Sequence, residues 1–364
     1  MTVRILLIGG TGHIGAAVLE VLKNSNLGTE ILALVRSNDD IEHTKNTYNN
    51  EIHAKLGSLS DIALLKEEAA AAQIIINCAP DMGSEPGISA LLSGLDASPA
   101  THKFYIGTSG ASRIWAPPDP TKPGDRIWDD LDDLSNFPTD ATHAESDILV
   151  QNANTSSLHT AIISPSFVIG KSPSRNHAAP ITFPDWHHVT RSTGGGWTIG
   201  PGANMTTFVD TADLAELYLL LVKDALPILN ESTAHAVIRE EVWGPQAYYF
   251  AGSFEVSIRE FVEKEMIPAL KRNEVTKEWI KYDGVKELGL EEVVNGILTR
   301  LGGTEGADLW SRHIAEGFGT SMRVRGRRGG RYLGWKTGGK VDLDAAVSAY
   351  VDHVVNHEGK AEGV

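Results

Sequence analysis

Residues 5–15 read Ile5-Leu6-Leu7-Ile8-Gly9-Gly10-Thr11-Gly12-His13-Ile14-Gly15, and this stretch decides the fold. Its apolar start predicts a buried strand, and residues 16–23 carry apolar side chains at helical spacing. In such a strand-turn-helix, the first glycine permits the tight turn and the third lets the helix pack on the sheet. The second leaves room for a pyrophosphate beside the free N–H groups of the helix. The stretch therefore predicts an α/β Rossmann fold that binds a dinucleotide.

The same alternation of short apolar runs and amphipathic segments continues through the first half of the chain. It predicts further strands at 31–35, 74–77, 104–106 and 160–163, and helices at 61–72, 85–95 and 142–152. This β-α-β-α order predicts a doubly wound parallel sheet with helices on both faces. We expect a dinucleotide-binding domain over residues 1–170 with a returning segment at 205–250. Residues 171–204 and 251–364 would form a smaller, mostly helical substrate-binding part.

Composition narrows the classes of function. The 364 residues carry a formal net charge of −15, which argues against a general surface for nucleic acid, because phosphate binding needs a basic field. The basic cluster at 323–331 is either a solvated loop or an anion contact. No stretch has the ~20 apolar residues that span a bilayer, so we expect no membrane contact. The single cysteine, Cys78, allows no intrachain disulfide, and we expect a cytoplasmic protein.

The end of the second predicted strand bears on the choice of cofactor. Folds of this kind that bind NAD place an acidic residue there, which accepts a hydrogen bond from the ribose 2′-hydroxyl. This chain has Val35-Arg36-Ser37 instead. Because Arg36 cannot accept a hydrogen bond but can pair with a 2′-phosphate, NADP(H) is favoured. Asp39 and Asp40 follow closely and could supply the missing acid, so NAD(H) stays open.

Four further motifs resemble those of the short-chain dehydrogenase/reductase superfamily, in its extended and atypical branches, and extend the match to nearly the whole chain. They are Gly57-Ser58-Leu59-Ser60-Asp61, Asn77-Cys78-Ala79, Phe208–Ala215 and Leu333–Lys336. The finer similarity is to atypical, mostly fungal members. The resemblance implies that Ser58 and Leu59 touch adenine. It implies that Cys78 and Ala79 lie beside the adenosine ribose, and Pro165 beside nicotinamide. The phosphates would lie on the turn residues Gly9, Thr11, Gly12, His13, Ile14 and Gly15.

The predicted helix at 142–152 departs from that superfamily, whose members carry Tyr-x-x-x-Lys there and a hydroxyl residue after the preceding strand. Here Ser109 stands at the hydroxyl position, and His143 and Asp147 replace the pair at the same spacing. In one interpretation His143 transfers a proton, since imidazole titrates near neutral pH, and Asp147 binds ribose hydroxyls. In the other, both residues only cap or pair locally. A catalytic His143 should lie within hydrogen-bond reach of Ser109.

The sequence leaves three functions open on this fold. We favour an NADP(H)-dependent oxidoreductase, or a related epimerase or dehydratase, acting on a small organic substrate such as a secondary metabolite. The alternatives are a non-catalytic dinucleotide-binding regulator of the NmrA-like type and a non-redox lyase or isomerase. His177, His187 and His188 lie in a loop expected to cover the site, without the spacing of a metal site. The superfamily resemblance also implies a homodimer, paired through the helices at 85–95 and 142–152.

Overall fold

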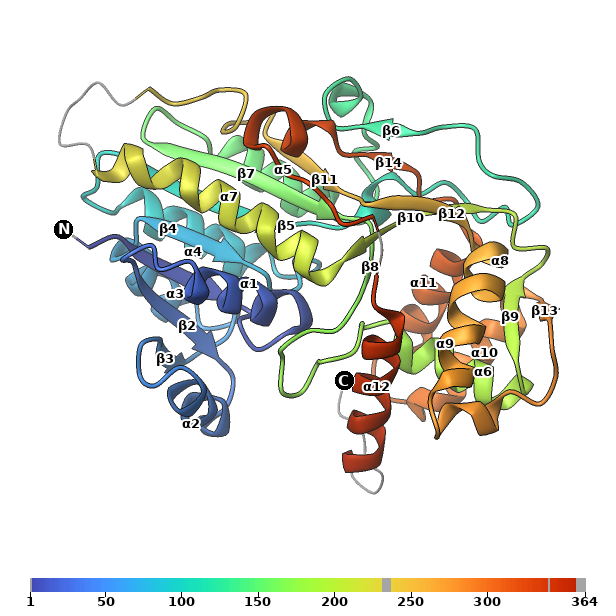
Figure 1. Ribbon diagram of the computed structural model, residues 1–364. Coiled ribbons are helices and arrows are strands. Elements are labelled where there is room, and N and C mark those ends of the chain that lie inside the picture. The colour runs from blue at the N-terminus through green and yellow to red at the C-terminus, as the bar shows by residue number, and fades with distance from the viewer. Residues whose placement is uncertain (1, 231–236, 340, 358–364) are drawn as a thin grey trace.

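The computed structural model describes residues 2–230, 237–339 and 341–357. Its larger lobe is built on a parallel sheet of order β11-β7-β5-β4-β1-β2-β3 (Figure 1). The strands are β1 (Arg4–Ile8), β2 (Glu30–Val35), β3 (His53–Leu56), β4 (Ile74–Asn77), β5 (Lys103–Thr108), β7 (Leu158–Pro165) and β11 (Tyr248–Ala251). Every neighbouring pair is parallel. This confirms the predicted Rossmann sheet, whose strand order reverses between β1 and β4.

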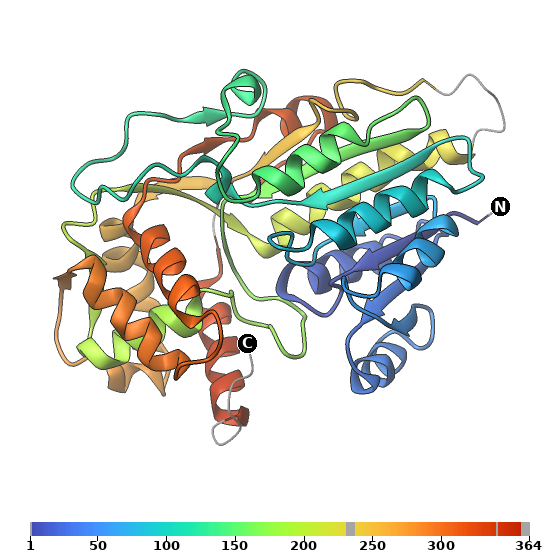
Figure 2. The same ribbon diagram turned by 180° about the vertical axis from the view of Figure 1, so that it is seen from behind.

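Helices cover both faces of this sheet (Figure 2). One face carries α1 (His13–Asn24), α2 (Asn38–Thr47) and α7 (Thr211–Asn230), and the other carries α3 (Ile62–Ala70), α4 (Glu85–Asp96) and α5 (Ala144–Asn152). Successive side chains of a strand point to opposite faces, so each face buries an apolar cluster of its own. Val18 and Leu221 belong to the first cluster, and Ile88 and Leu91 to the second.

The glycine turn between β1 and α1 has the geometry that its spacing predicts. Gly9 has a φ of +78°, and a Cβ there would lie 2.7 Å from Ala79 N. A Cβ on Gly15 would lie 2.0 Å from Gly9 O, so any side chain would push α1 away from the strand. A Cβ on Gly12 would meet only Gly9 O, at 3.3 Å, and otherwise points into open space.

The second lobe is mostly helical and lies beside the carboxyl edge of the sheet (Figure 1). Trp186 packs against Trp197, Phe261 and Phe318 at ring-centroid distances between 4.9 and 5.9 Å, so this lobe has an aromatic core of its own. Its elements are α6 (Phe183–Thr193), β9 (Gly196–Ile199), α8 (Ile258–Phe261), the π-helical Val262–Met266, α9 (Ile267–Arg272), the 3₁₀ turn Thr276–Trp279, β13 (Val285–Leu288), α10 (Leu290–Leu301), α11 (Ala307–Gly319) and α12 (Leu343–His357).

Short elements connect the two lobes and return the chain from the second lobe to the first. They are the sheet of β8 (Phe167–Ile169), β10 (Met205–Asp210) and β12 (Phe254–Ser257), the pair β6 (Trp128–Asp129) and β14 (Val324–Arg325), the 3₁₀ turns Ala111–Ile114 and Leu134–Asn136, and the π turn Gly329–Leu333. Trp335 Nε1 donates to Asp213 O on α7 at 2.8 Å. Residues 324–335, which the sequence-based division assigns to the second part, therefore lie against the dinucleotide-binding lobe.

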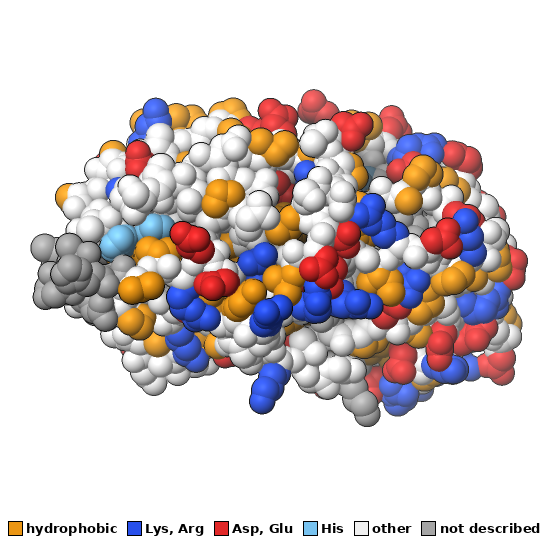
Figure 3. Space-filling model, turned by 90° about the horizontal axis from the view of Figure 1, so that it is seen from above, with side chains coloured by type: hydrophobic (Ala, Val, Ile, Leu, Met, Phe, Trp, Pro, Cys, Tyr) orange, Lys and Arg blue, Asp and Glu red, His pale blue; other side chains and the backbone are white. Residues whose placement is uncertain are grey.

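The basic cluster at 323–331 is held mainly by structural ion pairs. Arg323 pairs with Glu255 at 2.9 Å, and Arg327 with Asp129 at 2.6 Å. The face above β6 and β14 accordingly shows basic and acidic side chains next to one another (Figure 3). Arg323 and Arg327 therefore already have carboxylate partners, whereas Arg328 bonds backbone carbonyl oxygens of Asp130 and Glu241.

His187 on α6 is a buried polar group in an apolar setting. Its ring lies against Phe183, Trp279 and Tyr350, and neither ring nitrogen has a hydrogen-bond partner among the described residues. Burial lowers the pKa of His187 to about 3, so the ring is neutral in the folded protein at neutral pH. The unfolded chain takes up a proton near pH 6.5. The stability tied to this residue is therefore complete above pH 6.5 and is lost as the pH falls toward 3.

Replacing His187 with leucine should make the protein less sensitive to acid. With a folded-state pKa of about 3, His187 costs about 2 kcal/mol of stability on going from about pH 7 to about pH 5. Urea unfolding at the two pH values measures this loss, which should shrink by that amount in His187→Leu. The exposed His53 provides the control, since His53→Leu should leave the loss unchanged. An equal loss in His187→Leu and the parent protein would show that His187 is not held neutral.

Candidate active site

The carboxyl ends of β1, β4 and β5 bring three loops together where the strand order reverses. They are the glycine turn, residues 78–81 after β4 and residues 109–113 after β5. Parallel sheets of this kind bind their ligands at this edge. The start of α5 lies at the same edge, because His143 and Ser146 hydrogen-bond Asp81.

The glycine turn fits the pyrophosphate of a dinucleotide. Gly12 is the N-cap of α1, so the first N–H groups of the helix have neither an intrahelical partner nor a capping side chain. No acidic side chain lies in the first turn, and the helix dipole favours an anion there. The His13 ring is already engaged, with Nδ1 2.9 Å from His177 O and Nε2 2.8 Å from Thr211 Oγ1. His13 would therefore offer its backbone N–H, while Ile14 packs on the apolar cluster below.

The end of β2 leaves Arg36 available for a ligand. Arg36 is exposed and has no ion pair or hydrogen bond among the described residues. Ser37 caps α2, accepting a hydrogen bond from Asp40 N at 3.1 Å and donating to Asp40 Oδ2 at 2.7 Å. Asp40, one of the two acids that could have served NAD, is thus engaged in the helix cap.

The residues expected around adenosine and nicotinamide lie in order along the sheet edge. Ser58 N and Oγ both donate to Asp61 Oδ2, at 2.7 and 2.9 Å, which fixes the loop before α3 and places the half-buried Leu59 against α4. Cys78 and Ala79 lie directly against Gly9. Pro165 ends β7, two strands beyond β4. Their contacts with a cofactor stay predictions.

Ser109 and Asp147 form a buried pair rather than an open one. Ser109 Oγ donates to Asp147 Oδ2 at 3.1 Å and lies 3.3 Å from Tyr248 OH. Arg113 Nε lies 3.4 Å from the same carboxylate oxygen. Burial, helped by the charge of Asp81 and opposed by the hydrogen bond from Ser109, raises the pKa of Asp147 to about 7. The expected hydrogen bond between Ser109 and His143 is therefore absent, and Asp147 faces the protein interior instead of a ribose.

His143 has a different partner, Asp81, which sequence reasoning missed. His143 Nδ1 lies 2.8 Å from both carboxylate oxygens of Asp81, and Ser146 Oγ donates to Asp81 Oδ2 at 2.6 Å. The other ring nitrogen lies above Gly110, where a Cβ would be 2.6 Å from His143 Nε2. A side chain at position 110 would occupy the place of the imidazole. The signal for Asp81 was its position four residues beyond the end of β4, at the ligand-binding edge.

The backbone at His143 is strained. Helix α5 begins at Ala144 rather than at Thr142, and His143 is its N-cap with a φ of +69°. This left-handed conformation is costly for a residue other than glycine and persists only where the surroundings impose it. The hydrogen bond from His143 Nδ1 to Asp81 is such a constraint, because it fixes where the ring points.

A ring of the second lobe packs on Trp115, which follows the 3₁₀ turn after β5. His313 on α11 stacks on Trp115 with ring centroids 4.8 Å apart. A Cβ on Gly317 would lie 2.7 Å from the Trp115 ring, so the indole packs closely on α11. Burial and then the charge of His143 lower the pKa of His313. Trp115 Nε1 is buried without a hydrogen-bond partner among the described residues, which leaves one N–H donor for a ligand.

Comparison with known proteins finds proteins that are similar to this chain in sequence or in fold. No protein-family model matches the chain. Oxidase ucsJ from an Acremonium species is 26% identical over 359 residues, covering 92% of this chain and 93% of that protein. The dTDP-glucose 4,6-dehydratase of Bacillus anthracis, solved in complex with NAD, superimposes with a TM-score of 0.61 at 13% identity over 98% of each chain. Yeast methylglyoxal/isovaleraldehyde reductase Gre2, complexed with NADPH, gives 0.55 at 10% identity over 98% of this chain and 99% of its own.

The chain has the fold of these enzymes. The resemblance to extended short-chain dehydrogenases/reductases is thus confirmed at the level of the fold. The described residues contain no helix long and apolar enough to cross a membrane. Among the same residues, no group of three or more His, Cys, Asp or Glu side chains could hold a metal ion. His187 lies in the core of the second lobe, whereas His177 lies beside the glycine turn, so the loop histidines do not converge.

Proposed function

We propose that this chain is an NADP(H)-dependent oxidoreductase, or a related epimerase or dehydratase, that acts on a small organic substrate. The observation that carries the proposal is the Asp81–His143 pair at the edge where the uncapped first turn of α1 lies. A nicotinamide dinucleotide bound there would supply or accept a hydride. The similarity to an oxidase, and the fold shared with proteins solved with NAD or NADPH, support the same class.

His143 is the residue proposed to move the proton. Because Asp81 accepts from Nδ1–H, the neutral ring keeps Nε2 unprotonated, and this atom can take a proton from an alcohol. In the reverse direction the imidazolium donates the proton to a carbonyl oxygen. Asp81 stabilises the imidazolium by charge and keeps the ring oriented. In the resembled superfamily, a tyrosine transfers the proton and a neighbouring lysine assists it. Here His143 would transfer the proton and Asp81 would assist it.

The rings of Trp115 and His313 would position the substrate. Trp115 Nε1–H can donate to the substrate oxygen, which would satisfy the buried indole. His313 closes the same side from α11. Both rings are flat and mostly apolar, so they favour a substrate with a planar apolar body and a carbonyl or hydroxyl group at its end.

Turnover assays separate this proposal from the two alternatives. With NADPH and a panel of small aldehydes, ketones and enones, a net reductase should oxidise NADPH in a way that depends on one of the compounds. An epimerase or dehydratase returns the hydride and leaves the cofactor unchanged overall, but it should be slower with a substrate deuterated at the reacting carbon.

A non-catalytic regulator would bind NADPH and leave every compound unchanged. A lyase or isomerase that moves no hydride would convert a compound with no net change in the cofactor and no such isotope effect.

Arg36→Ala should weaken NADPH binding selectively. Loss of a charge-assisted contact to the 2′-phosphate costs roughly 1.5–3 kcal/mol, which is about 10- to 150-fold in affinity. NADH lacks that phosphate, so its affinity should stay within about two-fold. Titration of both cofactors by nicotinamide fluorescence measures the two constants. NADH binding as tightly as NADPH to the unchanged protein would contradict the role of Arg36.

A further inference from the structure

A segment between β8 and α6 crosses over the glycine turn and is tied to it. We call residues 171–177 the strap. Ser172 Oγ donates to His13 O at 2.7 Å, and Ser174 Oγ donates to Thr11 O at 2.5 Å. His177 O in turn bonds the His13 ring at 2.9 Å. Ser172 and Ser174 are buried, whereas Arg175 between them and His177 is exposed.

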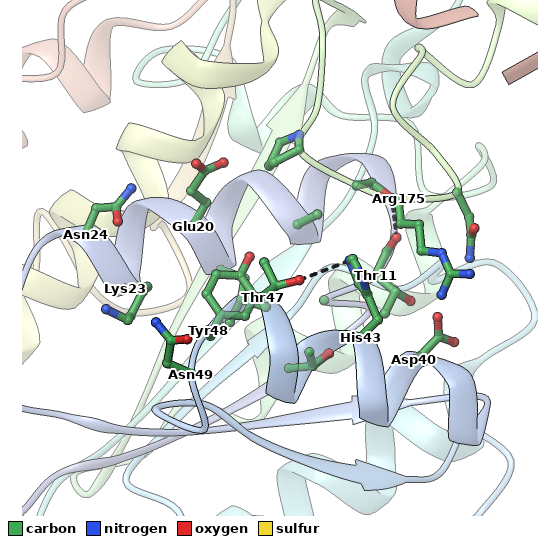
Figure 4. A pocket seen from close by; sticks show the side chains of 17 residues that line it. Thr11, Glu20, Lys23, Asn24, Asp40, His43, Thr47, Tyr48, Asn49 and Arg175 are labelled. Carbon is green, nitrogen blue, oxygen red and sulfur yellow. Dashed lines mark hydrogen bonds between the residues drawn. The ribbon is translucent and has the colours of Figure 1, made fainter. Parts of the chain in front are cut away.

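The strap forms one wall of a cavity of about 270 Å³ between α1 and α2. Thr11, Asp40 and Arg175 lie together at the end of the cavity next to the glycine turn (Figure 4). Lys23 and Asn24 lie at the opposite end. The strap therefore brings the guanidinium of Arg175, which is distant in sequence, to the start of α2.

Arg36 lies at the same place. Arg36 directly precedes Ser37, whose hydroxyl donates to Asp40 Oδ2 at 2.7 Å, and Asp40 lies at the same end of the cavity as Arg175 (Figure 4). Neither Arg36 nor Arg175 has an ion pair or hydrogen bond with another described residue. Two guanidiniums without such partners, one lining the cavity and one four residues before Asp40, are unusual in a chain with a formal net charge of −15. Asp40 is a carboxylate at that end of the cavity, and Ser37 already donates to one of its oxygens.

We infer that Arg175 and Arg36 form a two-sided site for the 2′-phosphate of the dinucleotide, with the strap closing over it. The inference rests on the proposed function and adds a residue to it. Guanidiniums bind phosphate oxygens with paired N–H donors, and two of them match the charge of a phosphate monoester. Ser172 and Ser174 set the position of Arg175 by fixing the strap to the backbone of the turn. Arg175 on the strap and Arg36 after β2 would thus bind the same phosphate from opposite sides.

The test measures dissociation constants of NADPH, NADH and 2′,5′-ADP for the full chain and its Arg175→Gln variant. Arg175→Gln removes the charge and keeps most of the length of the side chain. We expect the affinities for NADPH and 2′,5′-ADP to fall about 10-fold or more, and that for NADH to stay within about two-fold. Lys171→Gln removes an exposed charge from the same strap outside the cavity, and it should change none of the three constants.

Two results separate the inference from the proposed function. Unchanged NADPH binding in Arg175→Gln, beside a selective loss in Arg36→Ala, would overturn the role of Arg175 and leave the proposed function intact. An equal loss for NADPH and NADH would show that Arg175 only supports the local structure, and this also overturns the inference. If the parent protein binds neither dinucleotide, the proposed function fails and the inference fails with it. The double variant of Arg36 and Arg175 should bind NADPH and NADH equally.

Discussion

Replacement of Gly12 by valine is expected to lower NADPH affinity more than about 100-fold in a protein that still folds, equivalent to about 3 kcal/mol or more. In the unliganded chain a Cβ at this position meets only Gly9 O, at 3.3 Å, and is otherwise free of contact. The added methyl groups would instead occupy the space that the pyrophosphate needs beside the first N–H groups of α1. Isothermal titration calorimetry measures the affinity, and circular dichroism with thermal unfolding checks the fold.

A second glycine of the same turn provides the matched control. A Cβ on Gly15 would lie 2.0 Å from Gly9 O, so Gly15→Ala should disturb the packing of α1 and lower the unfolding temperature. Gly12→Val should unfold close to the parent temperature. If Gly12→Val still binds NADPH with the parent affinity, the dinucleotide does not lie on this turn.

Removal of the His143 ring is expected to lower kcat about 10²- to 10⁴-fold with a substrate found in the turnover panel, the range typical of a lost general acid or base. The affinity for NADPH should stay nearly unchanged, because the turn and the end of β2 are untouched. Backbone strain complicates the alanine variant, since His143 has a φ of +69°. Asparagine adopts this conformation more readily than most residues, so His143→Asn should lose the same activity with less disturbance of α5.

Asp81 provides the companion variant for this prediction. Asp81→Asn leaves the imidazole in place and removes the charge beside Nδ1, so we expect a smaller loss of kcat, about 10- to 100-fold. Full activity in both His143 variants would assign the protein to the regulators or to enzymes that use the cofactor only structurally.

The fold could be predicted from the sequence because its signals are local and agree with one another. The glycine spacing and the apolar strands 5–8 and 74–77 are found in the structure with little change. Within the Rossmann sheet and its covering helices, the elements that were missed are α2 and β3. Their sequences are mostly polar, and β3 is the edge strand of the sheet, so neither shows the apolar pattern on which the predictions rested.

The site could be predicted only in part, because tertiary contacts decide where polar side chains point. Ser109 and Gly110 are neighbours at the end of β5, and neighbouring residues of extended chain face opposite sides. The sequence could not show that the hydroxyl turns inward to Asp147 while the backbone of Gly110 faces His143. Asp81 was missed for the same reason, since its pairing with His143 spans 62 residues and leaves no local pattern.

The crystal structure of the chain with bound NADP(H) tests the central claim most directly. The account predicts the pyrophosphate on the first N–H groups of α1, the 2′-phosphate at Arg36, and the nicotinamide ring beside His143 Nε2. A dinucleotide bound at this edge with its nicotinamide turned away from His143, or no dinucleotide bound there at saturating NADP(H), would contradict it.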